Sequence, residues 1–321
     1  MPRGGGDEGM GFVSESTGDM QPKLLEGRYE VRSLIARGGM GSVFKAWDIR
    51  LHRSVAVKVM NPELTEDESA RVDREIAIAS HTHHPGFAEV LDIGVVDTST
   101  DERRFMVMEL VNGGSLQEAI VESAPDLKTV AEIGTQVADA LGHLHLRGVL
   151  HLDVKPGNIL IEHVPTLGFT RRARLIDFGI AQPIDGHGRA PGRSIVASAA
   201  YMSPEHVEGL PLGGGSDVYS LGLVLLRCIT GREEFTGTQA DAAIERLRRD
   251  PEIPELLPTG WSQLLAAMTL RAPAGRPTAH DVAGEFDAFA RASRHTPITF
   301  TPTRSPLAAA DDALSTAELA G

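Results

Sequence analysis

Two short stretches of the chain carry the side chains best suited to chemistry. The first, residues 151–158, contains Asp153, Lys155 and Asn158, and the second begins at Asp177 after an apolar run. Phosphoryl transfer needs such a set: a carboxylate that orients the attacking hydroxyl and accepts its proton, a lysine facing the phosphoryl group, and hard oxygen ligands for Mg²⁺. We therefore expect Asp153 and Lys155 to be catalytic and Asn158 and Asp177 to bind the metal.

A glycine-rich turn lies upstream, between two expected strands. It reads Ile35-Ala36-Arg37-Gly38-Gly39-Met40-Gly41-Ser42-Val43. Glycines allow backbone N–H groups to approach phosphates without a clashing Cβ atom, but most such turns are only turns. Lys58 follows on the next-but-one strand and Glu75 lies on the next helix, where a carboxylate would orient a lysine beside phosphates. The alternative for Glu75 is a solvated helix charge.

The elements that must position these residues change character along the chain. Residues 1–27 are polar and glycine-rich and are expected to be disordered, and residues 293–321 form a Pro/Thr/Ala-rich tail. Between them, residues 28–111 indicate a β-rich unit and residues 112–292 a mainly helical one. Apolar patterning predicts strands over 29–35, 42–47, 54–59, 89–93 and 105–109, and helices over 66–80, 129–147, 217–230, 240–248, 261–270 and 279–292.

Composition limits the class of protein. A chain of 321 residues suits one large domain or two lobes, and its formal net charge of -13 argues against a nucleic-acid partner. The single cysteine, Cys228, excludes an internal disulfide framework and lies in an apolar stretch that predicts a buried thiol. No apolar run reaches the roughly 18 residues of a membrane-spanning helix, and no signal-peptide core is present. We expect a soluble, cytoplasmic protein without a membrane span.

Taken in order, these motifs resemble those of bacterial eukaryotic-type (Hanks-type) Ser/Thr protein kinases. Residues 197–205 resemble the substrate loop of that family, which ends in a glutamate, here Glu205. Arg276 matches the arginine that pairs with this glutamate in the family, and Asp217 matches the aspartate that braces the catalytic loop. The resemblance runs from Tyr29 to about residue 289. It implies an α+β, bilobal fold, with a small antiparallel β-sheet lobe that carries the αC helix and a larger, mainly helical lobe.

The resemblance also implies an activity and individual roles. The protein would transfer the γ-phosphoryl of ATP to Ser/Thr hydroxyls of proteins, including its own, in signal transduction, with Mg²⁺ or alternatively Mn²⁺. Ser198 would bridge the catalytic Asp and Lys, backbone groups of Glu109 and Val111 would contact adenine, and Met108 would guard the back pocket. The expected nucleotide-binding residues are Ile35, Ala36, Arg37, Gly38, Gly39, Met40, Gly41, Val43, Ala56, Lys58, Glu75, Met108, Glu109, Val111 and Leu160.

Two positions depart from the family pattern. Ala36 replaces the first glycine of the turn, and its single methyl group should be tolerated with a modest rise in the KM for nucleotide. Leu152 replaces an arginine that pairs with a phosphorylated activation-loop residue. Because leucine cannot make that charge-assisted contact, we expect activity to depend weakly on phosphorylation of Ser194, the only hydroxyl in the variable part of the loop.

Alternatives remain at this point. A pseudokinase would act as a nucleotide-responsive scaffold, and a small-molecule phosphotransferase would share the fold but not the peptide-docking segment. Zinc binding by His81, His83 and His84 is disfavoured, because the spacing is unusual for zinc and no cysteine cluster accompanies it. The expected partners are protein substrates, a phospho-Thr-binding (FHA-type) protein that reads the tail, and a second copy of the chain.

Overall fold

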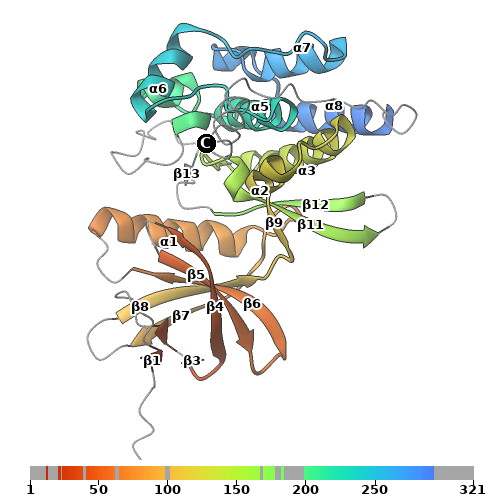
Figure 1. The fold of residues 1–321 in the computed structure, drawn as a ribbon. Helices are drawn as coiled ribbons and strands as arrows, with labels where there is room; N and C mark the ends of the chain where they lie inside the picture. The colour runs from red at the N-terminus through yellow and green to blue at the C-terminus, as the bar shows by residue number, and fades with distance from the viewer. Residues whose placement is uncertain are drawn as a thin grey trace, which may run out of the picture.

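The computed structural model describes residues 12–13, 21–22, 24–38, 41–61, 65–97, 102–166, 169–177, 182–183 and 199–292. This part of the chain forms a β-rich lobe and a larger helical lobe, connected through residues 110–112 (Figure 1). The predicted bilobal α+β fold is confirmed.

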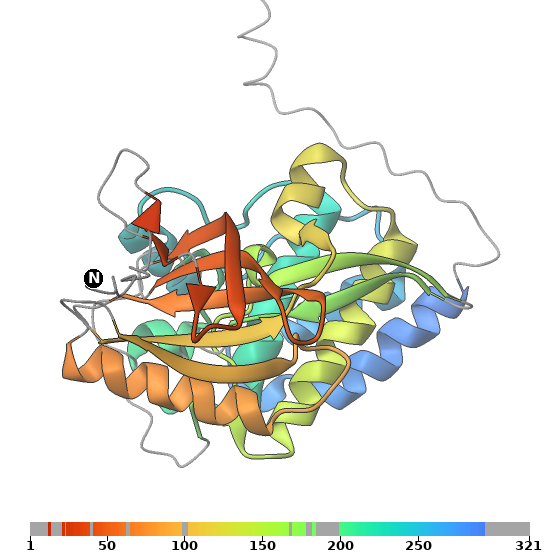
Figure 2. The same cartoon turned by 90° about the horizontal axis from the view of Figure 1, so that it is seen from below.

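The smaller lobe is a six-stranded antiparallel sheet in the order β3-β4-β5-β6-β8-β7. Its strands are β3 (Leu24–Leu25), β4 (Tyr29–Gly38), β5 (Gly41–Asp48), β6 (Arg53–Met60), β7 (Val90–Asp97) and β8 (Glu102–Glu109). Side chains alternate along β6, so Val55, Val57 and Val59 enter the core of the sheet while Ala56 and Lys58 point to its other face. Helix α1 (Glu66–His81) runs beside the strands, between the sheet and the helical lobe (Figures 1 and 2).

The sheet begins earlier in the chain than expected. Leu24 and Leu25 form strand β3, which pairs with β4, and Leu25 is fully buried in the core of the sheet. Two short strands, β1 (Phe12–Val13) and β2 (Gln21–Pro22), also pair with each other. The prediction of disorder for residues 1–27 is therefore wrong for these segments. Burial of the Leu25 side chain stabilises this edge of the sheet, although the composition around it is polar.

The larger lobe is built around helix α3 (Leu127–His145), which packs against α5 and α8. Its first turn is capped by Asp126, whose side chain accepts the backbone N–H of Thr129 at 2.7 Å. The other helices are α2 (Leu116–Glu122), α4 (Pro204–Glu208), α5 (Gly214–Thr230), α6 (Gln239–Arg248), α7 (Thr259–Met268) and α8 (Ala279–Ala292), and the 3₁₀ turns are η1 (Pro156–Asn158), η2 (Ala199–Tyr201) and η3 (Pro273–Gly275). Its strands are β9 (Gly113–Ser115), β10 (Val149–Leu150), β11 (Ile159–Thr166), β12 (Phe169–Leu175) and β13 (Gln182–Pro183).

One apolar core continues from the helical lobe into the small lobe. It includes Met60, Val72, Phe87 and Met106 together with the inward faces of α3, α5 and α8. Cys228 lies in this core, fully buried, and burial raises the pKa of its thiol to about 12, as expected for a structural cysteine. Side chains of both lobes therefore pack together in one shared core.

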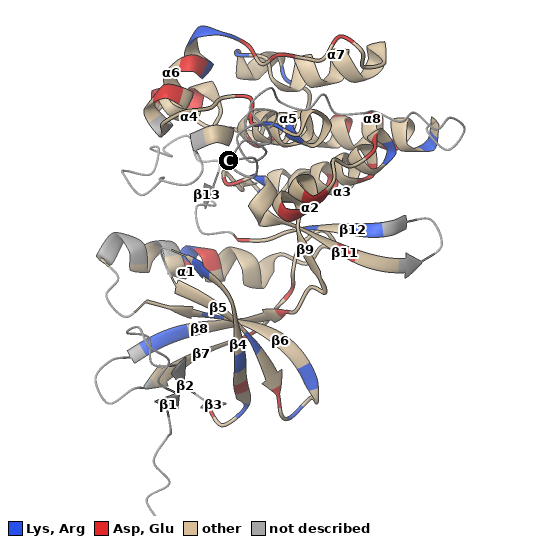
Figure 3. Ribbon diagram, viewed as in Figure 1, with Lys and Arg blue, Asp and Glu red and all other residues tan. Residues whose placement is uncertain are grey.

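Charged residues of both signs are interspersed along the two lobes (Figure 3). Within the described ranges, none of the helices combines the length and the apolar character that crossing a bilayer requires.

Candidate active site

The loop between β10 and β11 brings three of the predicted residues together. Lys155 Nζ donates to Asp153 Oδ2 at 2.8 Å, and Asn158 Nδ2 donates to the same oxygen at 2.8 Å and to the backbone O of Asp153 at 3.0 Å. The 3₁₀ turn η1 places Asn158 beside Asp153, and Asn158 is itself buried. The Asp153 carboxylate is thus oriented by two neighbours from its own loop.

Asp217 of α5 holds this loop in place through hydrogen bonds to its backbone. Its carboxylate accepts the backbone N–H groups of His151 and Leu152 at 2.9 and 2.7 Å, and it lies 2.8 Å from His145 Nε2. Burial acts to raise the pKa of Asp217, but the hydrogen bonds from His145 and the loop outweigh it and hold the pKa below its ordinary value. The predicted contact of Asp217 with the catalytic loop is confirmed. The sequence did not predict that His145 contacts Asp217, because no neighbouring residue distinguishes it from a surface histidine.

His151, which opens the catalytic loop, is fully buried, and its Nδ1 accepts the backbone N–H of Asp153 at 3.3 Å. Burial lowers the pKa of its imidazole, so the ring is neutral at physiological pH. The side chain therefore supports the loop rather than exchanging protons with a substrate.

A second cluster joins the small lobe to the segment that follows β12. Lys58 Nζ on β6 lies 2.5 Å from Glu75 Oε1 on α1 and 3.3 Å from Asp177 Oδ1. Burial acts to lower the pKa of Lys58, but the carboxylates of Asp177 and Glu75 outweigh it, so the pKa lies above its ordinary value and the ammonium is retained. The predicted pairing of Lys58 with Glu75 is confirmed, and Glu75 is a buried partner rather than a solvated helix charge.

The glycine-rich turn is the β4–β5 hairpin. Ala36 pairs with Val43 across this hairpin and lies in extended strand β4, so an alanine fits the backbone there. A Cβ atom at Gly41 would lie 2.3 Å from the backbone O of Val59, so the approach of β6 itself requires glycine at that position. Exposed along the same strand are Ile35, Arg37 and Gly38. The other two predicted residues of this turn, Gly39 and Met40, lie outside the described residues.

The residues expected around adenine lie on neighbouring strands and on the connection between the lobes. Ala56 pairs with Met108 across β6 and β8, and Glu109 ends β8, two residues before the buried Val111. Leu160 lies on β11, opposite Ser115 of β9, in the strand that begins directly after Asn158. These side chains therefore come from both lobes and from the segment that joins them.

The substrate-loop region is anchored by a buried ion pair. Arg276 donates to both oxygens of Glu205, at 2.7 and 2.8 Å, and Ser216 Oγ donates to Glu205 at 2.6 Å. The predicted Glu205–Arg276 pairing is thus confirmed, and it links α4 to the residue that follows η3, 71 positions later in the sequence. Ser198, expected to bridge Asp153 and Lys155, lies outside the described residues.

Two further arginines, missed in the sequence, fix the start of the same region. Arg246 of α6 donates to the backbone O of Ala200 at 2.8 Å, and Arg227 of α5 donates to the Tyr201 hydroxyl. Arg246 is almost fully buried and its guanidinium stacks on the ring of Phe235. Nothing in the sequence distinguishes these arginines from an exposed one such as Arg248 of α6, because their partners are far away along the chain.

The oxygen donors of Asn158 and Asp177 fit a hard divalent cation, since amide and carboxylate oxygens are ligands that Mg²⁺ accepts and bound phosphates complete its shell. The Asp177 side chain is 41% exposed, so a metal–nucleotide complex can reach it. Among the residues that the structure describes, no three His, Cys, Asp or Glu side chains group in a way that would hold a metal by themselves. A two-lobed fold with these two clusters defines a phosphotransferase of the protein kinase class.

Comparison with known proteins agrees with the geometry. Residues 29–285 match the protein kinase domain. The chain is 36% identical to serine/threonine-protein kinase PknB of Mycobacterium tuberculosis over 262 residues, covering 80% of this chain and 41% of that protein, and 37% identical to PknB of Mycobacterium leprae over 261 residues with the same coverage. It is 34% identical to PknA of Mycobacterium tuberculosis over 296 residues, covering 89% and 67%.

The chain therefore belongs to the protein kinase family, in its bacterial Hanks-type Ser/Thr branch. It spans about two fifths of the length of the PknB relatives. Membership of the family implies a nucleotide substrate, a divalent metal and protein substrates.

Proposed function

We propose that this chain transfers the γ-phosphoryl of ATP to Ser and Thr hydroxyls of proteins, including its own. One observation carries the proposal: the oriented carboxylate of Asp153, and the Lys58–Glu75 pair in contact with Asp177, are present together in one structure. A scaffold without activity would be expected to lack a base or a metal ligand. This chain retains both.

The roles follow from the contacts. Asp153 orients the acceptor hydroxyl and takes its proton as the oxygen bonds to the γ-phosphorus and the bond from that phosphorus to the ADP oxygen breaks. Lys155, beside it, faces the charge on the transferring phosphoryl group. Asn158 and Asp177 would hold Mg²⁺, or Mn²⁺, which would supply positive charge beside the phosphates of the nucleotide. Lys58, held charged by its carboxylate neighbours, orients the α- and β-phosphates.

The acceptor is proposed to be a protein because residues 200–205, which resemble the substrate loop of the family, are firmly anchored in the helical lobe. Ala200 and Tyr201 are held by arginines of α6 and α5, and Glu205 is held by Arg276, which follows η3. A small-molecule phosphotransferase would have no use for this anchoring. The observation therefore favours a peptide substrate.

The test is radiolabel transfer from Mg·ATP to the protein itself and to a generic basic protein. We expect transfer by the wild type and its loss in Asp153→Asn, which keeps the shape but removes the base. The matched control is Asp250→Asn, because the Asp250 side chain is 73% exposed and belongs to neither of the two clusters of the site. Binding of ATP without transfer by the wild type would overturn the proposal in favour of a scaffold.

Further proposals concern the partners and the location of the protein. The threonines of the tail, which lie outside the described residues, support an FHA-type partner that reads them after phosphorylation. Exposed apolar side chains on the edge strand β7, Ile93 and Val95, support a homodimer. We also propose a cytoplasmic location, supported by the single buried cysteine. Light scattering across a concentration series would test the dimer.

A further inference from the structure

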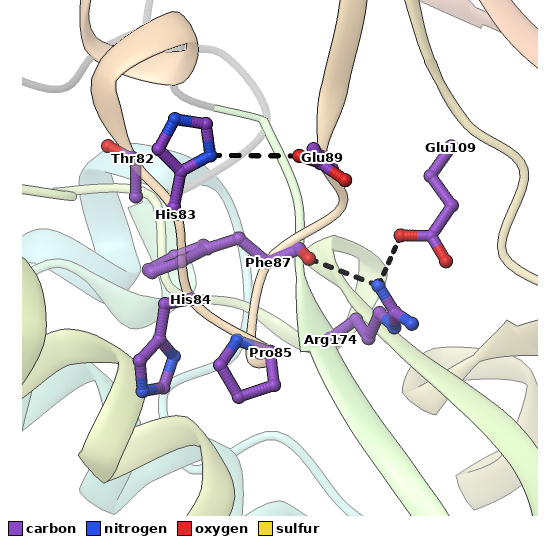
Figure 4. Close-up of a pocket in the computed structure, with 8 residues that line it drawn as sticks. All are labelled: Thr82, His83, His84, Pro85, Phe87, Glu89, Glu109 and Arg174. Atoms are coloured by element: carbon purple, nitrogen blue, oxygen red, sulfur yellow. Dashed lines mark hydrogen bonds and ion pairs between the residues drawn. The ribbon is translucent and has the colours of Figure 1, made fainter.

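Arg174 is a buried arginine on β12 that has no role in the site as described above. Its Nη1 lies 2.5 Å from Glu109 Oε2 and donates to the backbone O of Phe87 at 3.2 Å (Figure 4). Its Nε lies 3.5 Å from Glu162 Oε2 on the neighbouring strand β11. One guanidinium therefore touches three separate segments of the chain.

These segments come from both lobes, and one of them adjoins the connection between the lobes. Glu109 is the last residue of β8, where the chain leaves the small lobe, and Phe87 lies in the connection from α1 to β7. The backbones are also linked, because Glu109 N–H donates to Glu89 O at 2.8 Å and Leu175 N–H donates to Gly86 O at 2.7 Å. The Arg174 guanidinium adds side-chain contacts to Glu109, to the backbone O of Phe87 and to Glu162.

The position of Arg174 along the chain matters for the site. It lies on β12, the strand that leads to Asp177, and its partner Glu109 lies next to the backbone groups assigned to adenine. Because the guanidinium is charged and mostly buried, its hydrogen bonds are directional and strong. Movement of the lobe connection relative to β12 would break them. The contacts of Arg174 therefore connect the strand that leads to Asp177 with the residue that precedes the lobe connection.

We propose that Arg174 is a positioning residue for the nucleotide, which sets the lobe connection at Glu109 against β12. This proposal rests on the proposed kinase function, but it makes a statement about nucleotide binding that can be measured without phosphoryl transfer. The arginine does not touch the reacting atoms. It acts through Glu109 and the backbone beside it.

Chemical rescue is a suitable readout, because a cavity of about 260 Å³ adjoins the guanidinium. Its walls include His83, Glu89 and Pro85, and Figure 4 shows Arg174 and Glu109 at one side of it. A small cation that enters this cavity in Arg174→Ala can take the place of the missing guanidinium. A purely structural loss of packing would not be restored by such a cation.

The variants are Arg174→Ala, Arg174→Lys and the matched control Arg172→Ala. Arg172 lies on the same strand and faces the same Glu162, but it is 40% exposed and is not among the contacts of Glu109. We expect Arg174→Ala to raise both the KM for ATP and the calorimetric Kd for Mg·ADP about fivefold or more, with kcat within about twofold. Arg174→Lys should recover part of the affinity, millimolar guanidinium should recover part of it in Arg174→Ala, and Arg172→Ala should match the wild type.

A second pair of measurements keeps the inference testable if Arg174→Ala unfolds. Glu109→Gln should raise the Kd as well, and combining it with Arg174→Lys should add little, since both changes weaken one contact. An unchanged Kd in folded Arg174→Ala, a loss confined to kcat, or an increase in kcat would overturn the proposal. A wild type that binds Mg·ADP but transfers no phosphate would refute the kinase function alone, whereas a wild type that binds no nucleotide would refute both.

Discussion

The carboxylate of Asp217 accepts the backbone N–H of Leu152 at 2.7 Å, and Leu152 has a φ of +63°. A leucine in the left-handed region is strained, and such strain persists only where the surroundings enforce it. The buried carboxylate supplies that enforcement, because it holds the N–H groups of two consecutive residues at once. The conformation of the catalytic loop is therefore imposed by a residue on a different helix.

Removing the charge of Asp217 should release the loop. In Asp217→Asn one side-chain oxygen becomes an NH₂ group that cannot accept a hydrogen bond, so at least one of the loop N–H groups or His145 is left without its acceptor. We expect kcat to fall by about tenfold or more and the free energy of unfolding by about 2–4 kcal/mol. Steady-state kinetics and urea unfolding measure the two effects. Near-normal kcat in a folded Asp217→Asn would contradict this account of the loop.

The Glu205–Arg276 pair should be a large local contribution to stability. Both side chains are almost fully buried, so Arg276→Ala leaves a carboxylate in the interior without its cation. The expected loss in the free energy of unfolding is about 3–5 kcal/mol. Arg271→Ala is the control, because Arg271 is about half exposed and pairs with an exposed Asp250, and its loss should cost less than about 0.5 kcal/mol. Equal effects of the two substitutions in urea unfolding would show that the buried pair adds no stability.

Stability at acid pH should report on Asp48 in the small lobe. Arg28 donates to both of its oxygens at 3.0 and 2.8 Å, and with the N–H groups of Arg50 and Leu51 it lowers the pKa of the buried carboxyl from 3.8 to about 2. Because the folded pKa is below the unfolded one, the stabilisation is present above about pH 4 and is lost as the pH falls through about 2.

The difference in unfolding free energy between wild type and Asp48→Asn should accordingly be about 2 kcal/mol near pH 6 and shrink steadily below pH 4. Urea titrations at several pH values measure it. A difference that stays constant down to pH 2 would exclude Asp48 as the titrating group.

Phosphorylation of the activation loop should have little influence on activity. Leu152 is buried and uncharged, so it offers no partner to a phosphate at the position where an arginine would. Ser194 lies outside the described residues, but its replacement is a direct test. In Ser194→Ala we expect kcat within about twofold of wild type. A drop of tenfold or more would show that another cation receives the phosphate.

Much of the fold follows from local patterns. The predicted strands and helices correspond to β4 to β8 and to α1, α3 and α5 to α8, with shifted ends, because each carries an apolar run or apolar residues at the spacing of its element. Helix α2 was not predicted, since it is only seven residues long and its capping box, Ser115 with Glu118, is a weak signal alone. Leu25 was missed because burial depends on what covers a side chain rather than on the composition around it.

By itself, the sequence determined the chemistry of the site. Asp153, Lys155 and Asn158 lie within one loop, so their spacing alone brings a carboxylate, an ammonium and an amide together. The tertiary structure decided which distant charged groups meet: Asp217 beneath the loop, Arg276 on Glu205, and Arg174 on Glu109, 65 positions earlier. A buried charge is stable only beside a partner, and that partner is chosen by how the elements pack, which no local pattern records.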